Sequence, residues 1–241
     1  MPVRRTALLT LLLALGLAAP AHALTVYAAA SLREALPAFD DGPRYSFAGS
    51  NTLQRQVERG APADVLLAAS PREPLALYRA GRCTRPLTFA TNRLVLLVPQ
   101  GDPAKVRSVF GLRSGRRRLA VGSRGVPIGD YTRQVLQRLR LSSVLRTNTV
   151  SQEAAVSGVV AKVALRSADA GFVYATDARA AAGRTDAIAL PRRAQPTVRY
   201  QGCIVRRRGG DGEGAKAYVR ALLGARGRAV LQRFGFGLPP R

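Results

Sequence analysis

Short apolar runs alternate with helix-like segments along most of this chain, and the alternation constrains the fold more than any other feature of the sequence. The apolar runs at residues 24–29, 65–68, 119–122 and 170–174 have the length of buried strands. Segments with apolar residues at helical spacing lie between such runs. Strands that alternate with helices form parallel sheets with helices on both faces. The expected fold class is therefore α/β.

The first 23 residues have the pattern of an export signal. Two arginines precede an apolar run at residues 7–19, and Ala21-His22-Ala23 is a small-x-small cleavage site. The run is short for a membrane span, and no later stretch approaches about 20 uninterrupted apolar residues. We therefore expect a soluble protein that starts at Leu24 after cleavage, with an uncleaved anchor as the alternative. Without a cysteine at the junction, we expect a free periplasmic protein and not a lipoprotein.

Cleavage would limit the chemistry of the mature chain. His22 is the only histidine, so Ser-His-Asp catalysis, Cys-His catalysis and histidine metal sites are excluded once it is removed. The full chain has 38 Lys and Arg against 14 Asp and Glu, a formal charge of +24. These basic residues are spread along the chain and no nucleic-acid recognition motif accompanies them. We therefore expect a basic solvated surface and no specific nucleic-acid partner.

Cys83 and Cys203 are the only cysteines. In an oxidising compartment, an even number of cysteines with one possible pairing suggests a disulfide. Two buried free thiols are the alternative, and the sequence leaves both open.

Several junctions between a strand and a helix have the pattern of an anion site. In open α/β sheets, ligands bind beyond the carboxyl ends of the strands, where helix N-termini present unpaired N–H groups. Each junction also has an ordinary explanation, such as an N-cap; Ser31 with Glu34, for example, fits a capping box that opens a helix. The candidate positions are Ser31, Ser50, the loop at residues 126–129, the start of the helix that contains Val156, and Tyr174.

Motifs along the chain resemble those of the periplasmic molybdate-binding proteins of ABC transporters. The N-terminal half contains YAAASL at residues 27–32, FAGSNTL at 47–53 and GAPADV at 60–65. The same family order continues with NRLV at 92–95, AGFVYATDA at 170–178 and FGF at 234–236. The resemblance extends over nearly the whole mature chain, and the combination of motifs is more specific than any one of them.

The resemblance implies a two-lobed, type II periplasmic binding protein. Each lobe would be a mostly parallel sheet flanked by helices, with two hinge crossings between the lobes. After a signal peptide at residues 1–23, lobe one would contain residues 24–98 and 199–241, and lobe two residues 99–198.

The resemblance also implies a set of ligand residues. In this family, hydroxyls and main-chain N–H groups hold one tetrahedral oxyanion without any charged side chain. The matching positions here are the hydroxyls of Ser31, Ser50 and Tyr174 and the N–H groups of Ile128 and Val156. The sequence departs from the family at Ile128, where a smaller residue is common, and at Asn51, whose amide could add or displace a hydrogen bond.

The implied function is capture of molybdate or tungstate for an ABC permease and its ATPase at the inner membrane, by a monomer without a cofactor. These dianions are fully deprotonated and accept hydrogen bonds only, so a pocket of donors suits them. Phosphate carries a proton near neutral pH and needs an acceptor. Sulfate needs none, so another tetrahedral oxyanion such as sulfate is the alternative. An enzyme is not expected, because Ser31 and Ser50 have no histidine to activate them.

Overall fold

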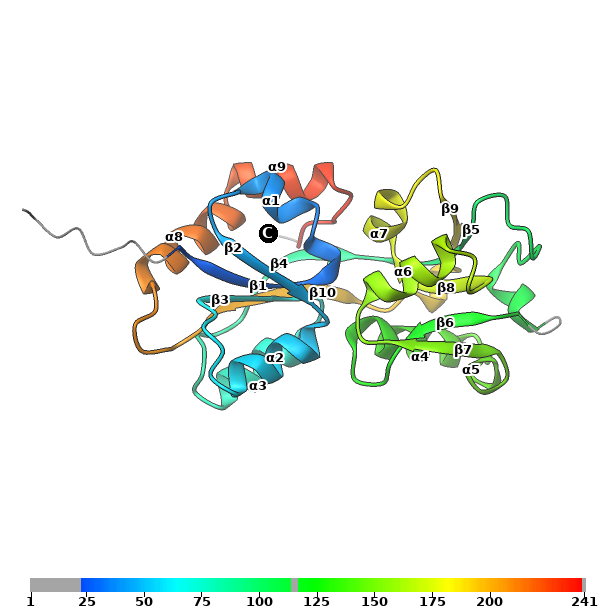
Figure 1. The fold of residues 1–241 in the computed structure, drawn as a ribbon, viewed down its shortest axis with the longest axis horizontal. Helices are drawn as coiled ribbons and strands as arrows, with labels where there is room; N and C mark the ends of the chain where they lie inside the picture. The colour runs from blue at the N-terminus through cyan, green and yellow to red at the C-terminus, as the bar shows by residue number, and fades with distance from the viewer. Residues whose placement is uncertain (1–22, 114–116, 240–241) are drawn as a thin grey trace, which may run out of the picture.

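The structure, a computed structural model, describes residues 23–113 and 117–239. The predicted signal peptide at residues 1–23 therefore lies outside the described residues, except for Ala23. Two lobes lie side by side, and each is built on one five-stranded sheet with helices on both faces (Figure 1). The predicted α/β fold with two lobes is confirmed. No helix within these two ranges is both long enough and apolar enough to cross a membrane.

Lobe one combines the N-terminal part of the chain with its C-terminal part. Its strands are β1 (Thr25–Ala29), β2 (Arg44–Ala48), β3 (Val65–Ala68), β4 (Leu87–Asn92) and β10 (Val198–Ile204), in the order β2-β1-β3-β10-β4. Its helical segments are η1 (Ala30–Leu32), α1 (Ala35–Phe39), α2 (Ser50–Glu58), α3 (Arg72–Arg79), α8 (Gly212–Leu223) and α9 (Ala225–Arg233). β10 is antiparallel to both of its neighbours, whereas β1 is parallel to β2 and β3. The sheet is thus mostly parallel, as predicted.

Lobe two is formed by the middle of the chain. Its strands are β5 (Leu94–Pro99), β6 (Leu119–Gly122), β7 (Thr149–Glu153), β8 (Ala170–Tyr174) and β9 (Thr185–Ala189), in the order β7-β6-β8-β5-β9. Its helical segments are η2 (Val109–Arg113), α4 (Pro127–Arg138), α5 (Ser143–Asn148), α6 (Val156–Ala164), α7 (Ala175–Ala180) and η3 (Arg192–Ala194). Here β5 is the strand that runs against its neighbours. In each lobe, the reversed strand is therefore the one that enters from the hinge.

The two hinge crossings connect β4 to β5 and η3 to β10. We expected lobe one to extend to residue 98, but β5 belongs to the second sheet, so the first crossing lies before Leu94. All six residues of β5 are buried, and the strand pairs with β8 and β9 on its two sides. The apolar run at residues 94–98, which the expected boundary places in lobe one, is therefore part of a buried strand of lobe two. The second crossing ends at Val198, one residue before the expected boundary.

One side chain connects the two crossings. The side-chain oxygen of Gln195 accepts a hydrogen bond from the N–H of Leu94 at 3.0 Å, and its amide donates to the carbonyl of Leu94 at 2.8 Å. A neighbouring strand would make the same pair of hydrogen bonds. The side chain of Gln195 therefore satisfies the backbone N–H and carbonyl of Leu94, where the chain passes between the lobes.

Candidate anion-binding site

A small cavity of about 10 Å³ lies between the lobes, where the carboxyl ends of strands meet the N-termini of helices. Residues from both lobes line it, and none of the described residues that line it is charged. The structure brings all five predicted ligand residues to this cavity: Ser31, Ser50, Ile128, Val156 and Tyr174. Their binding of an anion stays a prediction.

Ser31 lies in η1, directly after β1, and is 9% exposed. We expected its side chain to cap a helix together with Glu34, but no side-chain capping bond forms at the start of η1 or of α1. The Ser31 hydroxyl instead lies 2.8 Å from the hydroxyl of Tyr200, on β10. The Ser31 hydroxyl thus makes a tertiary contact in place of the expected local one. Because it caps no helix, it lies at the cavity with one hydrogen-bonding direction still open.

Ser50 is the first residue of α2 and is 1% exposed. Its Oγ accepts a hydrogen bond from the N–H of Ala69 at 3.0 Å. Because a hydroxyl has one proton to donate and this one already accepts from the backbone, its proton remains free for a partner in the cavity.

Ile128 is the second residue of α4, which begins at Pro127. Proline suits this first position, because its N–H would have no intrahelical partner in any case. A Cβ on Gly129 would lie 2.2 Å from the carbonyl oxygen of Ser123, so only glycine lets the helix start this close to the end of β6. First-turn N–H groups have no intrahelical acceptor, so that of Ile128 is available at the cavity.

Val156 begins α6, and no side chain caps that helix. Just before it, the backbone of lobe two lies close to that of lobe one. A Cβ on Gly49 would lie 2.2 Å from the carbonyl oxygen of Ala154, so glycine is required at this contact between the lobes. The N-termini of α2 and α6 therefore face each other across a narrow gap, and both contribute positive partial charge to the cavity.

Tyr174 ends β8 and is 1% exposed. Its hydroxyl is buried and has no hydrogen-bond partner among residues 23–113 and 117–239. Burial raises the pKa of this phenol well above its usual value, so it stays a donor. A buried hydroxyl without a partner costs free energy. The Tyr174 hydroxyl is therefore a donor available at the cavity.

An ion pair joins the lobes next to the cavity. The guanidinium of Arg72, at the start of α3, lies 2.6 Å from the carboxylate of Asp130 in α4 and also donates to the carbonyl of Gly125. The same guanidinium pairs at 2.7 Å with Glu73, which is fully buried and accepts a hydrogen bond from Ser70. Arg72 therefore pairs at the same time with a buried carboxylate of its own lobe and with a carboxylate of lobe two.

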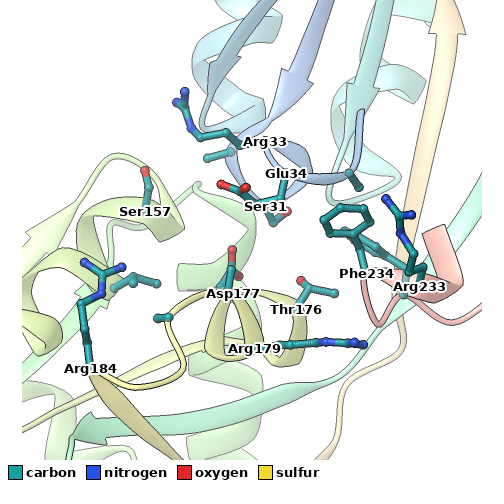
Figure 2. Close-up of a pocket in the computed structure, with 16 residues that line it drawn as sticks. Ser31, Arg33, Glu34, Ser157, Thr176, Asp177, Arg179, Arg184, Arg233 and Phe234 are labelled. Carbon is teal, nitrogen blue, oxygen red and sulfur yellow. The ribbon is translucent and has the colours of Figure 1, made fainter. Parts of the chain in front are cut away.

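A larger cavity of about 560 Å³ also lies between the lobes and shares Ala30 and Ser31 with the small one. Figure 2 shows Arg33 and Glu34 of lobe one across this cavity from Asp177 and Arg184 of lobe two. Removal of the Asp177 carboxyl from water disfavours its charged form and raises its pKa to about 7. The other cationic residues of the wall are Arg179 and Arg233, so arginines surround the approach to Ser31.

Cys83 and Cys203 lie together in a small apolar cluster of lobe one, and both are buried free thiols in the structure. A hydrogen bond from the Cys203 thiol lowers the pKa of Cys83. The structure thus brings the two sulfurs into contact, and the disulfide between them stays a prediction.

Sequence reasoning missed the long-range contacts around the cavity. Tyr200 contacts Ser31 over a separation of 169 residues, and Arg72 contacts Asp130 over 58. No local sequence pattern predicts contacts between residues so far apart in the chain. Asn51, considered as a possible extra ligand, does not line the small cavity, and its buried side-chain oxygen has no partner among the described residues.

Two lobes joined by two crossings, with a donor-lined cavity between them, define the class of two-lobed solute-binding proteins. The chain belongs to the family of bacterial extracellular solute-binding proteins, which it matches over residues 24–237. The prediction of a binding protein and not an enzyme is confirmed by this membership. It also indicates a location outside the cytoplasm.

Individual relatives agree with that assignment. The chain is 31% identical over 229 residues to the molybdate-binding protein ModA of Mycobacterium tuberculosis (strain H37Rv), which covers 91% of this chain and 86% of the relative. It is 31% identical over 236 residues to the molybdate-binding protein ModA of Escherichia coli (strain K12), with 88% of each chain covered. The periplasmic molybdate-binding protein of Azotobacter vinelandii has the same fold, with a TM-score of 0.79 at 22% identity over 90% of this chain and 100% of that one.

Proposed function

We propose that this protein captures molybdate or tungstate between its lobes and delivers the anion to an ABC permease and its ATPase. The observation that carries the proposal is the uncharged cavity to which both lobes contribute donors, with the buried Tyr174 hydroxyl left without an acceptor. The names of the relatives that are 31% identical over most of the chain support the same ligand.

The donor set suits the chemistry of the proposed ligand. Molybdate and tungstate are dianions without protons near neutral pH, so every oxygen can accept a hydrogen bond from the cavity wall. Hydrogen phosphate would bring an O–H group into a cavity that offers it no acceptor, at a cost of about 1–3 kcal/mol. Sulfate has no proton either, so only the size of the closed cavity would select against it. Sulfate is therefore the ligand to test against.

Ligands that bridge the lobes favour the closed conformation, because an open protein could use only one lobe's donors at a time. A permease could then distinguish loaded from empty protein by shape. We propose that the protein does this as a monomer in the periplasm, released from its signal peptide after Ala23 and without a lipid anchor. The mass of the protein recovered from the periplasm tests the cleavage site and the absence of lipid.

Thermal unfolding of the mature protein tests the ligand. An anion at about 100 times its dissociation constant should stabilise the protein by about 2.7 kcal/mol, a Tm increase of about 5–10 °C for a chain of this size. We expect this increase with molybdate and with tungstate, and none with sulfate or phosphate at the same concentration. An increase with sulfate alone would replace the proposed ligand, and no increase with any of the four would contradict the proposal.

A further inference from the structure

Tyr200 lies directly behind the cavity, on β10, the strand that returns from the hinge to lobe one. Its ring is fully buried and makes edge contacts with the rings of Phe89, Tyr174 and Phe236, at centroid distances of 6.0, 5.8 and 5.3 Å. Aromatic rings offer no conventional acceptor, so the hydroxyl must find its partners at its other neighbours. Those neighbours are Ser31 at 2.8 Å and the side-chain amide of Asn92 at 3.5 Å.

The orientation of the Asn92 amide determines where the Tyr200 proton goes. The side-chain oxygen of Asn92 accepts a hydrogen bond from the N–H of Arg93 at 2.9 Å. Its NH₂ group therefore faces Tyr200 and also Thr176, whose hydroxyl lies 3.0 Å away. An NH₂ group only donates. The Tyr200 oxygen thus accepts from Asn92, and the one acceptor left within reach of its own proton, among the described residues, is Ser31 Oγ.

Because Ser31 accepts a hydrogen bond from Tyr200, its own hydroxyl proton is free to be donated. Ser31 lines the cavity, so this proton is available to a ligand there. Ser50 is in the same state, because it accepts from the N–H of Ala69. The protein therefore uses the acceptor capacity of both serines and leaves only their protons for a ligand. With the opposite orientation, Ser31 would donate to Tyr200, whose buried proton would then have no acceptor.

We propose that Tyr200 is a positioning residue that fixes Ser31 as a donor and so sets the preference of the cavity for anions without protons. This inference rests on the proposed function and assigns the selectivity of that site to a residue outside the cavity. Asn92 takes part by occupying the Tyr200 oxygen, and it does so from the last residue of β4, next to the first hinge crossing. Burial raises the pKa of the Tyr200 phenol well above its usual value, which keeps its proton in place.

The test replaces Tyr200 by Phe, which keeps the ring and removes the hydroxyl. Without its donor, Ser31 can rotate and accept a proton from a ligand. We expect molybdate to bind about 2- to 10-fold more weakly, the range for one neutral hydrogen bond. Hydrogen phosphate should lose less or gain, so the ratio of the two dissociation constants narrows. Calorimetric titration with molybdate, and competition by phosphate, measure that ratio.

Two further variants separate positioning from packing. Tyr218→Phe removes another buried phenol, which contacts Tyr45 away from the cavity, and should leave the ratio unchanged. Asn92→Asp keeps the aromatic cluster intact but places an acceptor beside the Tyr200 hydroxyl. The Tyr200 proton should turn toward the new carboxylate, and the ratio should narrow as it does in Tyr200→Phe.

A double-mutant cycle decides whether Tyr200 acts through Ser31. If it does, Ser31→Ala combined with Tyr200→Phe binds molybdate no more weakly than Ser31→Ala alone. Additive losses, or an unchanged ratio in both Tyr200→Phe and Asn92→Asp, overturn the inference while molybdate binding by the unmodified protein stands. Failure of the unmodified protein to bind molybdate or tungstate overturns the proposed function, and this inference with it.

Discussion

Arg72 of lobe one and Asp130 of lobe two form an ion pair 2.6 Å long beside the small cavity. The pair can form only when the lobes are close together, so it contributes to the closed state and not to the fold of either lobe. Because the Arg72 side chain is 52% exposed, the contribution should be small, about 0.2–1 kcal/mol, and weaker at high salt.

Asp130→Asn should therefore speed release of the anion about 2- to 5-fold and change the Tm of the ligand-free protein little. Stopped-flow dissociation at low and high salt measures the effect, and the difference from the unmodified protein should shrink at high salt. Asp169→Asn is the matched control, since Asp169 forms a 2.8 Å pair with Arg118 within lobe two. Equal release rates for Asp130→Asn and the unmodified protein would exclude a role of the pair in closure.

Arg72→Ala should behave differently from Asp130→Asn, because Arg72 also pairs with the fully buried Glu73. Removing the guanidinium leaves that carboxylate without its cation. We expect a loss of about 1–3 kcal/mol in the free energy of unfolding, measured by urea denaturation without ligand. Equal stability of the two variants would show that Ser70 alone satisfies the Glu73 carboxylate.

Ser31→Ala combined with Ser50→Ala should abolish anion binding, because each change removes a donor to a charged ligand. Hydrogen bonds to charged groups contribute about 1.5–3 kcal/mol each, so the two together correspond to a loss of at least 100-fold in affinity. Far-ultraviolet circular dichroism should be unchanged, since both hydroxyls contribute little packing. Calorimetry with molybdate measures the loss, and full affinity in the double variant would exclude these serines as ligands.

Tyr174→Phe should stabilise the empty protein while it weakens binding. The Tyr174 hydroxyl is buried without a partner among the described residues, so its removal costs no hydrogen bond and relieves a desolvation penalty. We expect an unchanged or slightly higher Tm without ligand and an affinity for molybdate about 10-fold or more lower. A lower Tm in the empty protein would show that the hydroxyl already has a partner, such as an ordered water.

The contrast between Tyr174 and Tyr200 shows how far the sequence could predict this site. Motif order located Ser31, Ser50 and Tyr174, because each lies at or just after the end of a strand in a recognisable segment. The role of Tyr200 depends on a contact across 169 residues, and its own neighbours in β10, Arg199 and Gln201, form no motif that indicates it. The sequence also predicts Ser31 as half of a capping box. The structure has the tertiary contact with Tyr200 in place of that local hydrogen bond.

The predicted boundary of lobe one at residue 98 differs from the structure for a related reason. The sequence at residues 94–98 is apolar throughout, which is typical of a buried strand but does not say which sheet buries it. Only the pairing with β8 and β9 places it in lobe two. Periodicity therefore located most of the strands, whereas the position of the hinge is a property of the assembled sheets.

Cys83 and Cys203 should form a disulfide in protein recovered from an oxidising compartment. Their thiols are already in contact, and the lowered pKa of Cys83 favours the thiolate that attacks an exchanging disulfide. The bond would close a loop of 120 residues and stabilise the protein by roughly 4–5 kcal/mol in the chain-entropy model. Thiol titration of the denatured protein should find no free thiol, and reductant should lower the Tm. Two free thiols per chain would exclude the bond.

The arginines around the larger cavity should accelerate capture of the anion without contacting it. Arg33, Arg184 and Arg233 are exposed at its wall, and a cationic wall raises the local concentration of a dianion. Replacing all three by Gln should lower the association rate constant about 3- to 10-fold at low salt and leave the dissociation rate constant unchanged. Arg206→Gln with Arg208→Gln, on exposed residues that line a separate cavity, is the control for net charge. If both sets of variants slow association equally per charge removed, the total charge of the protein and not this wall attracts the anion.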